Sequence, residues 1–448
     1  MRKNLLLIVV ALAFTFTQTF VVKADEAGIY VKAGTAGTGK SWDDAIGSLS
    51  DALTKAKTDG LKFVYVANGE YSEPASVTVP AGISVIGGYT GAGNSTILKN
   101  TGEGDVVILD EGTSGSRARI SDFTLTGATS GRGINAKAYG EIYNCIIENN
   151  NLVATNLKAG AAQDLKESGA GVFLMGNNLL ERCIIRNNVA ENTVGGGISV
   201  FGSNVVIKNC LVTDNVSKGK YKTVKNSTGG ILFQANTKNC KVINTTVAGN
   251  TGYHTGGIWI AGSNSTQTWT NCVVWGNNST WDEEGWTAQP NINFKAQTSS
   301  TLTCINDYFP QKLQDIDKKE ISGISLLSLE NNVDDGDKKA PKFTDPERGV
   351  FALAAESPLV DAGSDSDYGE GLDHDLTITG ESRKSGKSID IGAYEYQHSS
   401  GIVSVHGDNS DCEEIYYTIT GIRLGGKPTQ PGIYVKVKGI ECSKIIVR

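Results

Sequence analysis

Two short motifs alternate through the middle of the chain, and this repeat limits the possible folds more than any other feature. The first motif is a turn of small residues followed by an apolar position, at 131–134, 169–172, 196–198, 229–231 and 256–258. The second motif starts at a Cys, or once at a Thr, and ends at an Asn five residues later. Its copies are Cys145 to Asn150, Cys183 to Asn188, Cys210 to Asn215, Thr245 to Asn250 and Cys272 to Asn277. The spacing between copies varies while the motifs keep their length, so insertions lie in loops. Repeats of this kind predict stacked supersecondary units.

Each copy is interpreted as three short strands, separated by a turn with Gly or Asn, a bend at Asn, and a variable loop. Short strands that coil and stack about 4.8 Å apart form a parallel β-helix. Stacking would place β-branched residues in two interior rows, where each packs against its own copies. One row is Ile134, Val172, Ile198, Ile231 and Ile258, and the other is Ile147, Ile185, Val212, Val247 and Val274.

Composition agrees with a solenoid rich in turns. Gly accounts for 54 of the 448 residues, whereas Pro is 9, His 4 and Met 2. Such a chain favours turns over helices. The net charge of −7 indicates no basic surface, which argues against nucleic acid as a partner.

The eight Cys residues would normally indicate disulfides in an exported protein. Four of them share one interior column of the repeat: Cys145, Cys183, Cys210 and Cys272. We therefore interpret these thiols as small buried apolar groups. Cys412 with Cys442 is the better candidate for a disulfide.

A column of Asn precedes those Cys residues. Its members are Asn144, Asn209, Asn244 and Asn271, with Arg182 as the exception. Asn tolerates the left-handed backbone of a sharp bend and can hydrogen-bond its copy in the next coil. The pattern predicts an Asn ladder; unrelated turn residues are the alternative.

The start of the chain predicts export. Residues 1–24 combine a basic start, an apolar run from Leu5 to Phe16, and a small residue, Ala24, before Asp25. A membrane anchor would need about 20 apolar residues, and Thr15 and Thr17 interrupt this run. We expect a signal peptide and a secreted or cell-surface protein. In the following cap region, residues 25–100, the pattern from Ser48 to Lys57 predicts an amphipathic capping helix.

Several segments resemble secreted β-helix proteins of Bacteroidetes, relatives of the pectate-lyase-like superfamily. They are Ile29-Tyr30-Val31, Val64 to Ala67, Gly82 to Tyr89, Ser357-Pro358-Leu359-Val360-Asp361-Ala362-Gly363 and Ile389 to Glu395. The resemblance implies an all-β, single-stranded right-handed parallel β-helix over 25–398, with a closing signature at 340–398. Residues 399–448 resemble the C-terminal β-sandwich-like modules used for export or surface sorting, which implies association with the outer membrane or cell surface.

The resemblance also implies that a binding cleft lies along the outward face of the strand after the long loops. The outward positions there are Asn135, Phe173, Ser199, Leu232 and Trp259, none of them acidic. Glycoside hydrolysis needs a pair of carboxyl groups, and a lyase needs a base, usually with Ca²⁺ held by carboxylates. This row supplies neither, so the loops at 151–168, 216–228 and 278–291 become the place to search.

The last of these loops combines three carboxylates with two aromatic rings. The candidate sugar contacts are Trp259, Trp281 and Trp286, and the candidate catalytic groups are Asp282, Glu283, Glu284 and His254. Ca²⁺ is the ion that the acidic residues would hold. The alternatives are a solvated acidic loop, a turn hydrogen bond for His254, and Trp269 and Trp275 as packing residues. Asp373, Asp375 and Asp390 are expected to serve turns and caps.

Three functions remain open. The first is a non-catalytic or weakly catalytic surface protein that binds extracellular polysaccharide. The second is a polysaccharide lyase or glycoside hydrolase, and the third is a structural stalk or adhesin. The missing acidic row favours binding over catalysis, and the aromatic loop favours a glycan over a protein partner.

Overall fold

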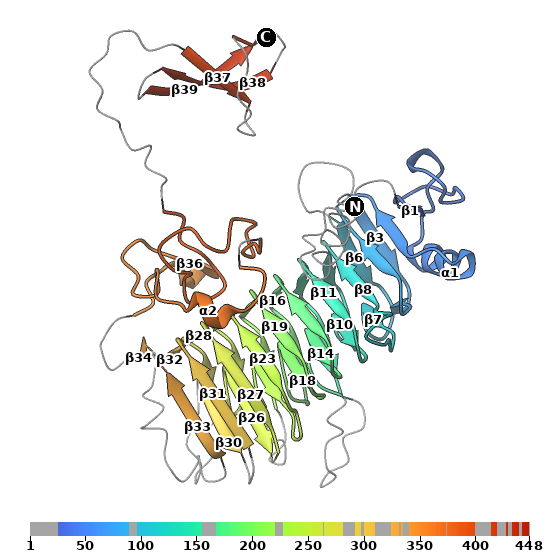
Figure 1. Ribbon diagram of the computed structural model, residues 1–448. Helices are drawn as coiled ribbons and strands as arrows, with labels where there is room; N and C mark the ends of the chain where they lie inside the picture. Colours follow the sequence, from blue (N-terminus) through green and yellow to red (C-terminus); the bar gives the residue numbers. More distant parts are fainter. Residues whose placement is uncertain are drawn as a thin grey trace, which may run out of the picture. The chain divides into compact units, whose positions relative to one another are not determined.

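The computed structural model describes residues 26–88, 96–154, 167–219, 227–262, 264–280, 292–296, 300–309, 324–330, 333–334, 340–372, 374–398, 414–418, 427–428, 432–438 and 441–447. The predicted signal peptide lies outside these ranges. The chain divides into two units, one up to Tyr396 and one from Gln397 onward. In the first unit, short parallel strands stack side by side into long sheets (Figure 1). The predicted all-β, right-handed parallel β-helix is confirmed.

Three long parallel sheets form the described solenoid. Sheet A consists of β1 Gly28–Val31, β2 Phe63–Val66, β5 Ser84–Ile86, β8 Arg119–Ser121, β11 Glu141–Tyr143, β15 Leu179–Glu181, β19 Val206–Lys208, β23 Cys240–Ile243, β27 Thr266–Thr270, β31 Ser300–Ile305 and β33 Ile324–Glu330. Sheet B consists of β3 Gly69–Glu73, β6 Thr96–Asn100, β9 Thr124–Thr126, β12 Ile146–Glu148, β16 Ile184–Arg186, β20 Leu211–Thr213, β24 Thr246–Ala248, β28 Val273–Trp275, β32 Tyr308–Phe309 and β34 Val333–Asp334. Sheet C consists of β4 Val77–Val79, β7 Val107–Leu109, β10 Ile134–Ala136, β14 Val172–Leu174, β18 Ile198–Val200, β22 Ile231–Phe233, β26 Ile258–Gly262 and β30 Ile292–Ala296.

A fourth, short sheet follows sheet B in five of the coils. It consists of β13 Asn151–Val153, β17 Val189–Glu191, β21 Val216–Ser217, β25 Thr251–Gly252 and β29 Asn278–Ser279. The three-strand interpretation of each copy missed it, because these strands lie at the start of the segments that vary in length. The coils also begin earlier than the motifs, since β2 to β5 already form a turn of the solenoid within the expected cap region.

Both predicted interior rows are confirmed. Ile134, Val172 and Ile198 are register partners in neighbouring strands of sheet C, and the row continues through Ile231 and Ile258. The second row runs in the same way along sheet B. All these side chains are at most 1% exposed. Because each Ile or Val packs against an Ile or Val of the next coil, successive coils share the same packing arrangement.

The Cys column is buried and unpaired, as predicted. Cys145, Cys183, Cys210 and Cys272 are free and at most 1% exposed. Burial raises the pKa of the Cys145 and Cys183 thiols well above the usual value. Such thiols stay protonated and unreactive. The proposed partner of Cys442, Cys412, lies outside the described residues.

The predicted capping helix is present as α1, Leu49–Asp59, at the first coils (Figure 1). Its apolar face is buried, with Ser48 as N-cap and Gly60 in the left-handed conformation at its end. The carboxylate of Glu73, in sheet B, accepts hydrogen bonds from the backbone N–H of Leu49 at 2.9 Å and the hydroxyl of Ser50 at 2.9 Å. A negative charge at a helix N-terminus is favourable, so Glu73 ties the helix to the solenoid.

The Asn that closes each motif forms a buried ladder. The Nδ2 of each residue donates to the Oδ1 of the next at 2.9–3.0 Å, and the same Oδ1 accepts from the backbone N–H of the preceding Asn. The members are Asn150, Asn188, Asn215, Asn250 and Asn277. They are at most 6% exposed. A complete set of hydrogen bonds is what permits five buried amides at this corner.

The sequence predicted the ladder one bend earlier, at the column of Asn residues that precedes the Cys column. We call this column the bend column, and the prediction of a ladder there is only partly correct. Asp122, Asn144 and Arg182 do adopt the predicted left-handed conformation, as do the corresponding residues of later coils. Within this bend column Asn144 bonds Asp122 at 2.6 Å and Asn271 bonds Asn244 at 3.1 Å. Asn209 and Asn306 bond the segment described next.

Residues 340–398 form the closing segment, which covers part of sheet B. It contains β35 Phe343–Asp345, a 3-10 helix Pro346–Arg348, β36 Val350–Leu353 and α2 Asp365–Tyr368. Its Leu353, Leu359 and Ile391 pack on Val273 and Tyr308, and its Phe351 packs on Leu211 and Ala248. The covered side chains of sheet B are at most 3% exposed, whereas Ile146 and Ile184 in earlier coils are partly exposed.

A buried ion pair holds the closing segment together. The side chains of Arg383 and Glu395 are fully buried and lie 2.9 Å apart. Arg383 also donates to the carbonyls of Gly392 at 3.1 Å and Tyr394 at 2.7 Å. Glu395 accepts from the backbone N–H groups of Ser385 and Asp390, both at 2.9 Å. The predicted signature around Asp390 therefore forms the polar centre of this segment.

The second unit contains three described antiparallel strands. They are β37 Glu414–Thr418, β38 Gly432–Lys438 and β39 Glu441–Val447, in the order β37-β38-β39. The remaining described element of the chain is a 3-10 helix at Trp42–Asp44. In the described part of the chain, no helix combines the length and apolar character needed to cross a membrane.

Replacing Asn215 in the middle of the ladder should destabilise the protein strongly. Asn215→Ala removes the acceptor of the buried Asn188 backbone N–H, one acceptor of the Asn188 amide, and the amide donor to the Ile185 carbonyl. We expect a loss of about 3 kcal/mol in the free energy of unfolding, measured by urea titration. Asp214→Asn, at the exposed neighbouring position, should change it by less than about 0.5 kcal/mol. Equal effects of the two variants would contradict a stabilising ladder.

Arg383→Met should destabilise the closing segment by about 3 to 5 kcal/mol, because Glu395 would be left buried without its partner. Limited proteolysis of the folded protein should then cut within 340–398 faster than in wild type. Lys384→Met removes the neighbouring, partly exposed ion pair with Asp365 and should cost at most about 1 kcal/mol. Unchanged proteolysis of Arg383→Met would show that the pair does not hold the segment.

Candidate functional site

The outward row of sheet C is aligned as predicted but is mostly buried. Phe173 pairs with Ser199, Ser199 with Leu232, and Leu232 with Trp259. All four are at most 2% exposed. Val194, which follows β17, packs on Leu232 and Trp259, and Arg132 and Phe201 lie against Phe173. The expectation of a cleft along this row is therefore wrong over β14 to β26, because side chains from neighbouring segments pack against it.

Trp259 and His254 form a buried pair. Trp259 is 2% exposed and His254 1%, and their rings lie 4.8 Å apart between centroids. The Nδ1 of His254 lies 3.1 Å from the hydroxyl of Thr255, which matches the alternative of a turn hydrogen bond. A buried ring offers no face to a sugar, so the prediction of Trp259 as an exposed contact is wrong.

The other aromatic and acidic residues considered above either pack within the protein or lie outside the residues that the structure describes. Trp269 points into the core with its ring 5.9 Å from that of Phe233, and Trp275 packs 5.6 Å from Phe343 of the closing segment. The loop residues Trp281, Asp282, Glu283, Glu284 and Trp286 lie outside the described residues, so their roles stay predictions. Within the described residues, no three His, Cys, Asp or Glu side chains gather closely enough to hold a metal ion.

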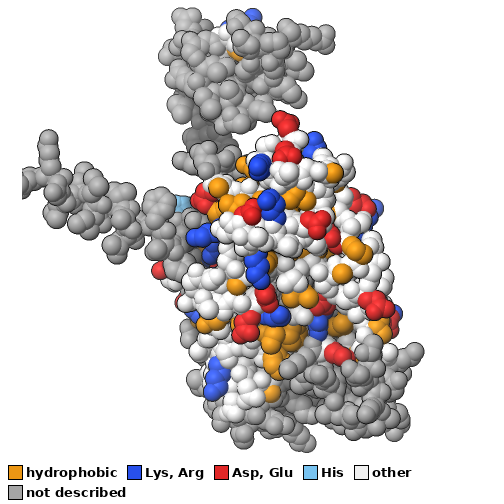
Figure 2. Space-filling model, turned by 90° about the vertical axis from the view of Figure 1, so that its right-hand side faces the viewer, with side chains coloured by type: hydrophobic (Ala, Val, Ile, Leu, Met, Phe, Trp, Pro, Cys, Tyr) orange, Lys and Arg blue, Asp and Glu red, His pale blue; other side chains and the backbone are white. Residues whose placement is uncertain are grey.

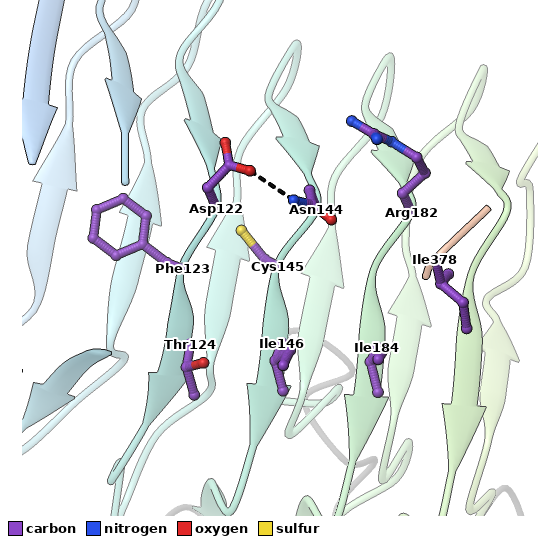
Figure 3. Close-up of a pocket in the computed structure, with 9 residues that line it drawn as sticks. All are labelled: Asp122, Phe123, Thr124, Asn144, Cys145, Ile146, Arg182, Ile184 and Ile378. Atoms are coloured by element: carbon purple, nitrogen blue, oxygen red, sulfur yellow. Dashed lines mark hydrogen bonds between the residues drawn. The ribbon is translucent and has the colours of Figure 1, made fainter. Parts of the chain in front are cut away.

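A recess opens instead at the corner between sheets A and B (Figure 3). It is a small cavity of about 80 Å³ lined by Asp122, Phe123, Thr124, Asn144, Cys145, Ile146, Arg182, Ile184 and Ile378. Ile378 comes from the closing segment and lies beside Ile184 (Figure 3). The recess is thus the point where the closing segment stops covering the corner.

The polar side chains of the recess come from successive bends of the bend column. Asn144 donates to the carboxylate of Asp122 at 2.6 Å (Figure 3). The guanidinium of Arg182 makes no hydrogen bond or ion pair with any residue that the structure describes, and its side chain is partly exposed. An Arg in this state can still donate to a ligand.

Beside the recess, the outward face of sheet A carries the row Tyr143, Glu181 and Lys208. These residues are register partners in β11, β15 and β19. The hydroxyl of Tyr143 donates to Glu141 at 3.2 Å, and Lys208 forms an ion pair with Asp375 of the closing segment at 2.5 Å. The predicted turn residue Asp375 therefore anchors one end of this row.

Glu141 and Glu181 lie in different electrostatic surroundings. Glu141 pairs with Arg117 at 3.2 Å and Arg119 at 2.5 Å. Burial raises the pKa of Glu181, and the charge of Asp375 raises it further, while Lys208 and Arg182 lower it. Burial also raises the pKa of Tyr143 well above its usual range, so this phenol stays protonated and donates hydrogen bonds.

The recess and the row beside it can bind a ligand that is mainly polar and also has some apolar surface. It offers an aromatic ring, amide and guanidinium donors, carboxyl acceptors and the edges of Ile146, Ile184 and Ile378. Acidic and basic side chains are intermingled on the face shown in Figure 2, without a large area of one sign. Sequence analysis missed this site. Arg182 as the exception in the Asn column was its one visible signal, and only the register shows which residues stand beside it.

A match to a family model supports the fold. Residues 81–293 match the model of a family described as the right handed beta helix region. Among solved structures, the chain is similar to the A-module of the Azotobacter vinelandii mannuronan C-5 epimerase AlgE4, with 12% identity over 64% of this chain and 90% of that chain and a TM-score of 0.31. It is also similar to PfbA, a surface adhesin of Streptococcus pneumoniae, with 11% identity over 63% of this chain and 85% of that chain and a TM-score of 0.22. No curated protein matches the sequence.

The carboxyl group of Glu181 should make stability depend on pH. Because its folded pKa lies above the ordinary 4.5, its contribution is complete below about pH 4.5 and is lost as the pH rises through the folded pKa. Glu181→Gln lacks this loss, so the variant should gain stability relative to wild type as the pH rises. Urea titrations at several pH values measure the difference. Glu70→Gln, at an exposed ion pair of sheet B, is the control; a pH-independent difference for Glu181→Gln would contradict the assignment.

Proposed function

We propose that this chain is an exported protein that binds a glycan outside the cell, through the corner recess and the adjoining side chains of Tyr143 and Glu181. One observation carries the proposal: the closing segment covers the later part of sheet B, and packed side chains cover the outward row of sheet C, whereas the recess and the partly exposed Tyr143 and Glu181 beside it stay accessible. The predicted signal peptide supports export, and the sequence resemblance supports a place at the cell surface with the C-terminal module as its attachment.

The side chains at this surface suit a sugar better than a flat protein partner. Sugar rings present hydroxyl groups next to apolar C–H faces, and sites for such ligands combine a few polar groups with aromatic or aliphatic contacts. Among the described residues, the exposed large hydrophobic side chains are Met175 and Val350, at 37% and 42%. Two isolated side chains do not make an apolar patch of the kind that marks a protein interface.

Binding can be measured with residues 25–448 and a panel of hyaluronan, polygalacturonate, xylan, galactan and dextran. Wild type should bind at least one polymer in affinity electrophoresis. Tyr143→Ala should weaken that binding about tenfold, a change of about 1.4 kcal/mol, through loss of the ring and its hydroxyl. Lys241→Ala, exposed on the same sheet but away from the recess, is the matched control. Retention of full affinity by Tyr143→Ala would reject this surface as the site.

Glycan cleavage is the second candidate function, favoured by the contrast between Glu181 and Glu141. Two carboxyl groups in neighbouring coils, one with a raised pKa and one paired with Arg117 and Arg119, provide an acid and a base of the kind that glycoside hydrolysis uses. If the bound polymer shortens over hours in size-exclusion chromatography, Glu181→Gln should stop the cleavage and keep the binding. A polymer of constant length leaves binding as the function.

A further inference from the structure

The bend column at the corner of sheets A and B is a row of side chains, one from each coil. Its members all have left-handed backbones, with φ between 44° and 67°: Asp122, Asn144, Arg182, Asn209, Asn244, Asn271 and Asn306. The strands on either side keep their register from coil to coil, so the row repeats about every 4.8 Å. A row with this regular spacing can follow an extended chain.

The later half of the row is already occupied by the closing segment. Asn244 donates to the carbonyl of Asp390 at 2.7 Å, and Asn271 both donates to the carbonyl of Ser364 at 3.1 Å and accepts from its N–H at 2.8 Å. The other two contacts are Asn209 to the hydroxyl of Tyr368 at 2.7 Å and Asn306 to the carbonyl of Ala362 at 3.1 Å. Each amide of this half therefore contacts a polar atom of the closing segment.

The earlier half, at Arg182, Asn144 and Asp122, makes no such contact. Among the described residues that line the recess, Ile378 is the one that the closing segment contributes, and its side chain is apolar (Figure 3). The residue at the boundary is Arg182, where the neighbouring later coils have Asn, and its guanidinium has no ion pair or hydrogen bond among the described residues. The bend column thus continues past the last residue that the closing segment contacts. At that point the side chain changes from the amide of Asn to the guanidinium of Arg182.

We propose that the open half of the bend column binds an anionic group of the glycan, with the guanidinium of Arg182 as its main contact. This inference rests on the proposed function and specifies the ligand: a polysaccharide with carboxylate or sulfate groups. The recess of about 80 Å³ is far below the several hundred Å³ of a pocket for a whole ligand and suits one such group. Arg binds planar carboxylates and sulfate oxygens with two parallel hydrogen bonds.

The neighbouring charges permit an anion there. The carboxylate of Asp122 already accepts from Asn144, and it lies two coils, about 10 Å, from Arg182 along the row. Glu181 is adjacent, and burial together with the charge of Asp375 raises the pKa of its carboxyl group, which disfavours a full negative charge there. Lys208, in the next coil of the row beside the recess, is held by Asp375. Arg182 is therefore the cation of this site that a ligand can pair with.

Arg182→Asn is the sharpest test, because Asn is the residue that the same bend carries in the coils of Asn144 and Asn209. The substitution restores the column, so folding should be preserved, which thermal melting checks. Lys241→Asn removes one positive charge from sheet A away from the corner and serves as the matched control. The probes are hyaluronan and polygalacturonate as carboxylates, dextran sulfate as a sulfate, and dextran and galactan as neutral polymers.

Wild type should bind at least one anionic polymer more tightly than the neutral ones. Arg182→Asn should lower that affinity at least tenfold without changing neutral binding, while Lys241→Asn should change neither. The polymer class that shows the loss identifies carboxylate or sulfate. If wild type binds acidic and neutral polymers equally, or if Arg182→Asn keeps full affinity for the acidic ones, the proposed function stands and this inference fails. Absence of binding to all five polymers overturns both.

Discussion

The buried ladder of Asn150, Asn188, Asn215, Asn250 and Asn277 is the interaction on which the rest of the structure depends. At this corner the chain leaves sheet B, and the backbone groups of each bend have to be satisfied away from water. The ladder does this by repeating the same hydrogen bonds from coil to coil. Because β13, β17, β21, β25 and β29 each start directly after a member of the ladder, these strands align and form the short sheet.

That alignment decides which surfaces of the solenoid are available. Residues that follow the short strands, among them Val194 and His254, pack against the outward row of sheet C and bury Trp259. The closing segment buries the later part of sheet B and occupies the later half of the bend column. The open surface is the earlier part of the corner with the adjoining face of sheet A. The candidate site thus lies where neither the closing segment nor the residues packed on sheet C cover the solenoid.

The chemistry of the site follows from the same geometry. Neighbouring coils bring Tyr143, Glu181 and Lys208 into one row, although they are far apart in the chain. Burial raises the pKa of Glu181, whereas Glu141 forms ion pairs with two Arg residues. The site combines binding groups with a carboxyl group suited to proton transfer, which is why glycan binding and glycan cleavage are both testable at one surface.

The sequence by itself determined the repeat and therefore the fold. The interior rows, the buried thiols, the left-handed bends and helix α1 all follow from side-chain size and backbone preference, which act locally or between identical copies. The location of the site was decided by tertiary structure. Whether Trp259 is covered, which Asn column forms the ladder, and where the closing segment stops at Arg182 depend on contacts between segments far apart in the chain. Periodicity carries no information about such contacts, because covered and open copies of a motif have the same local pattern.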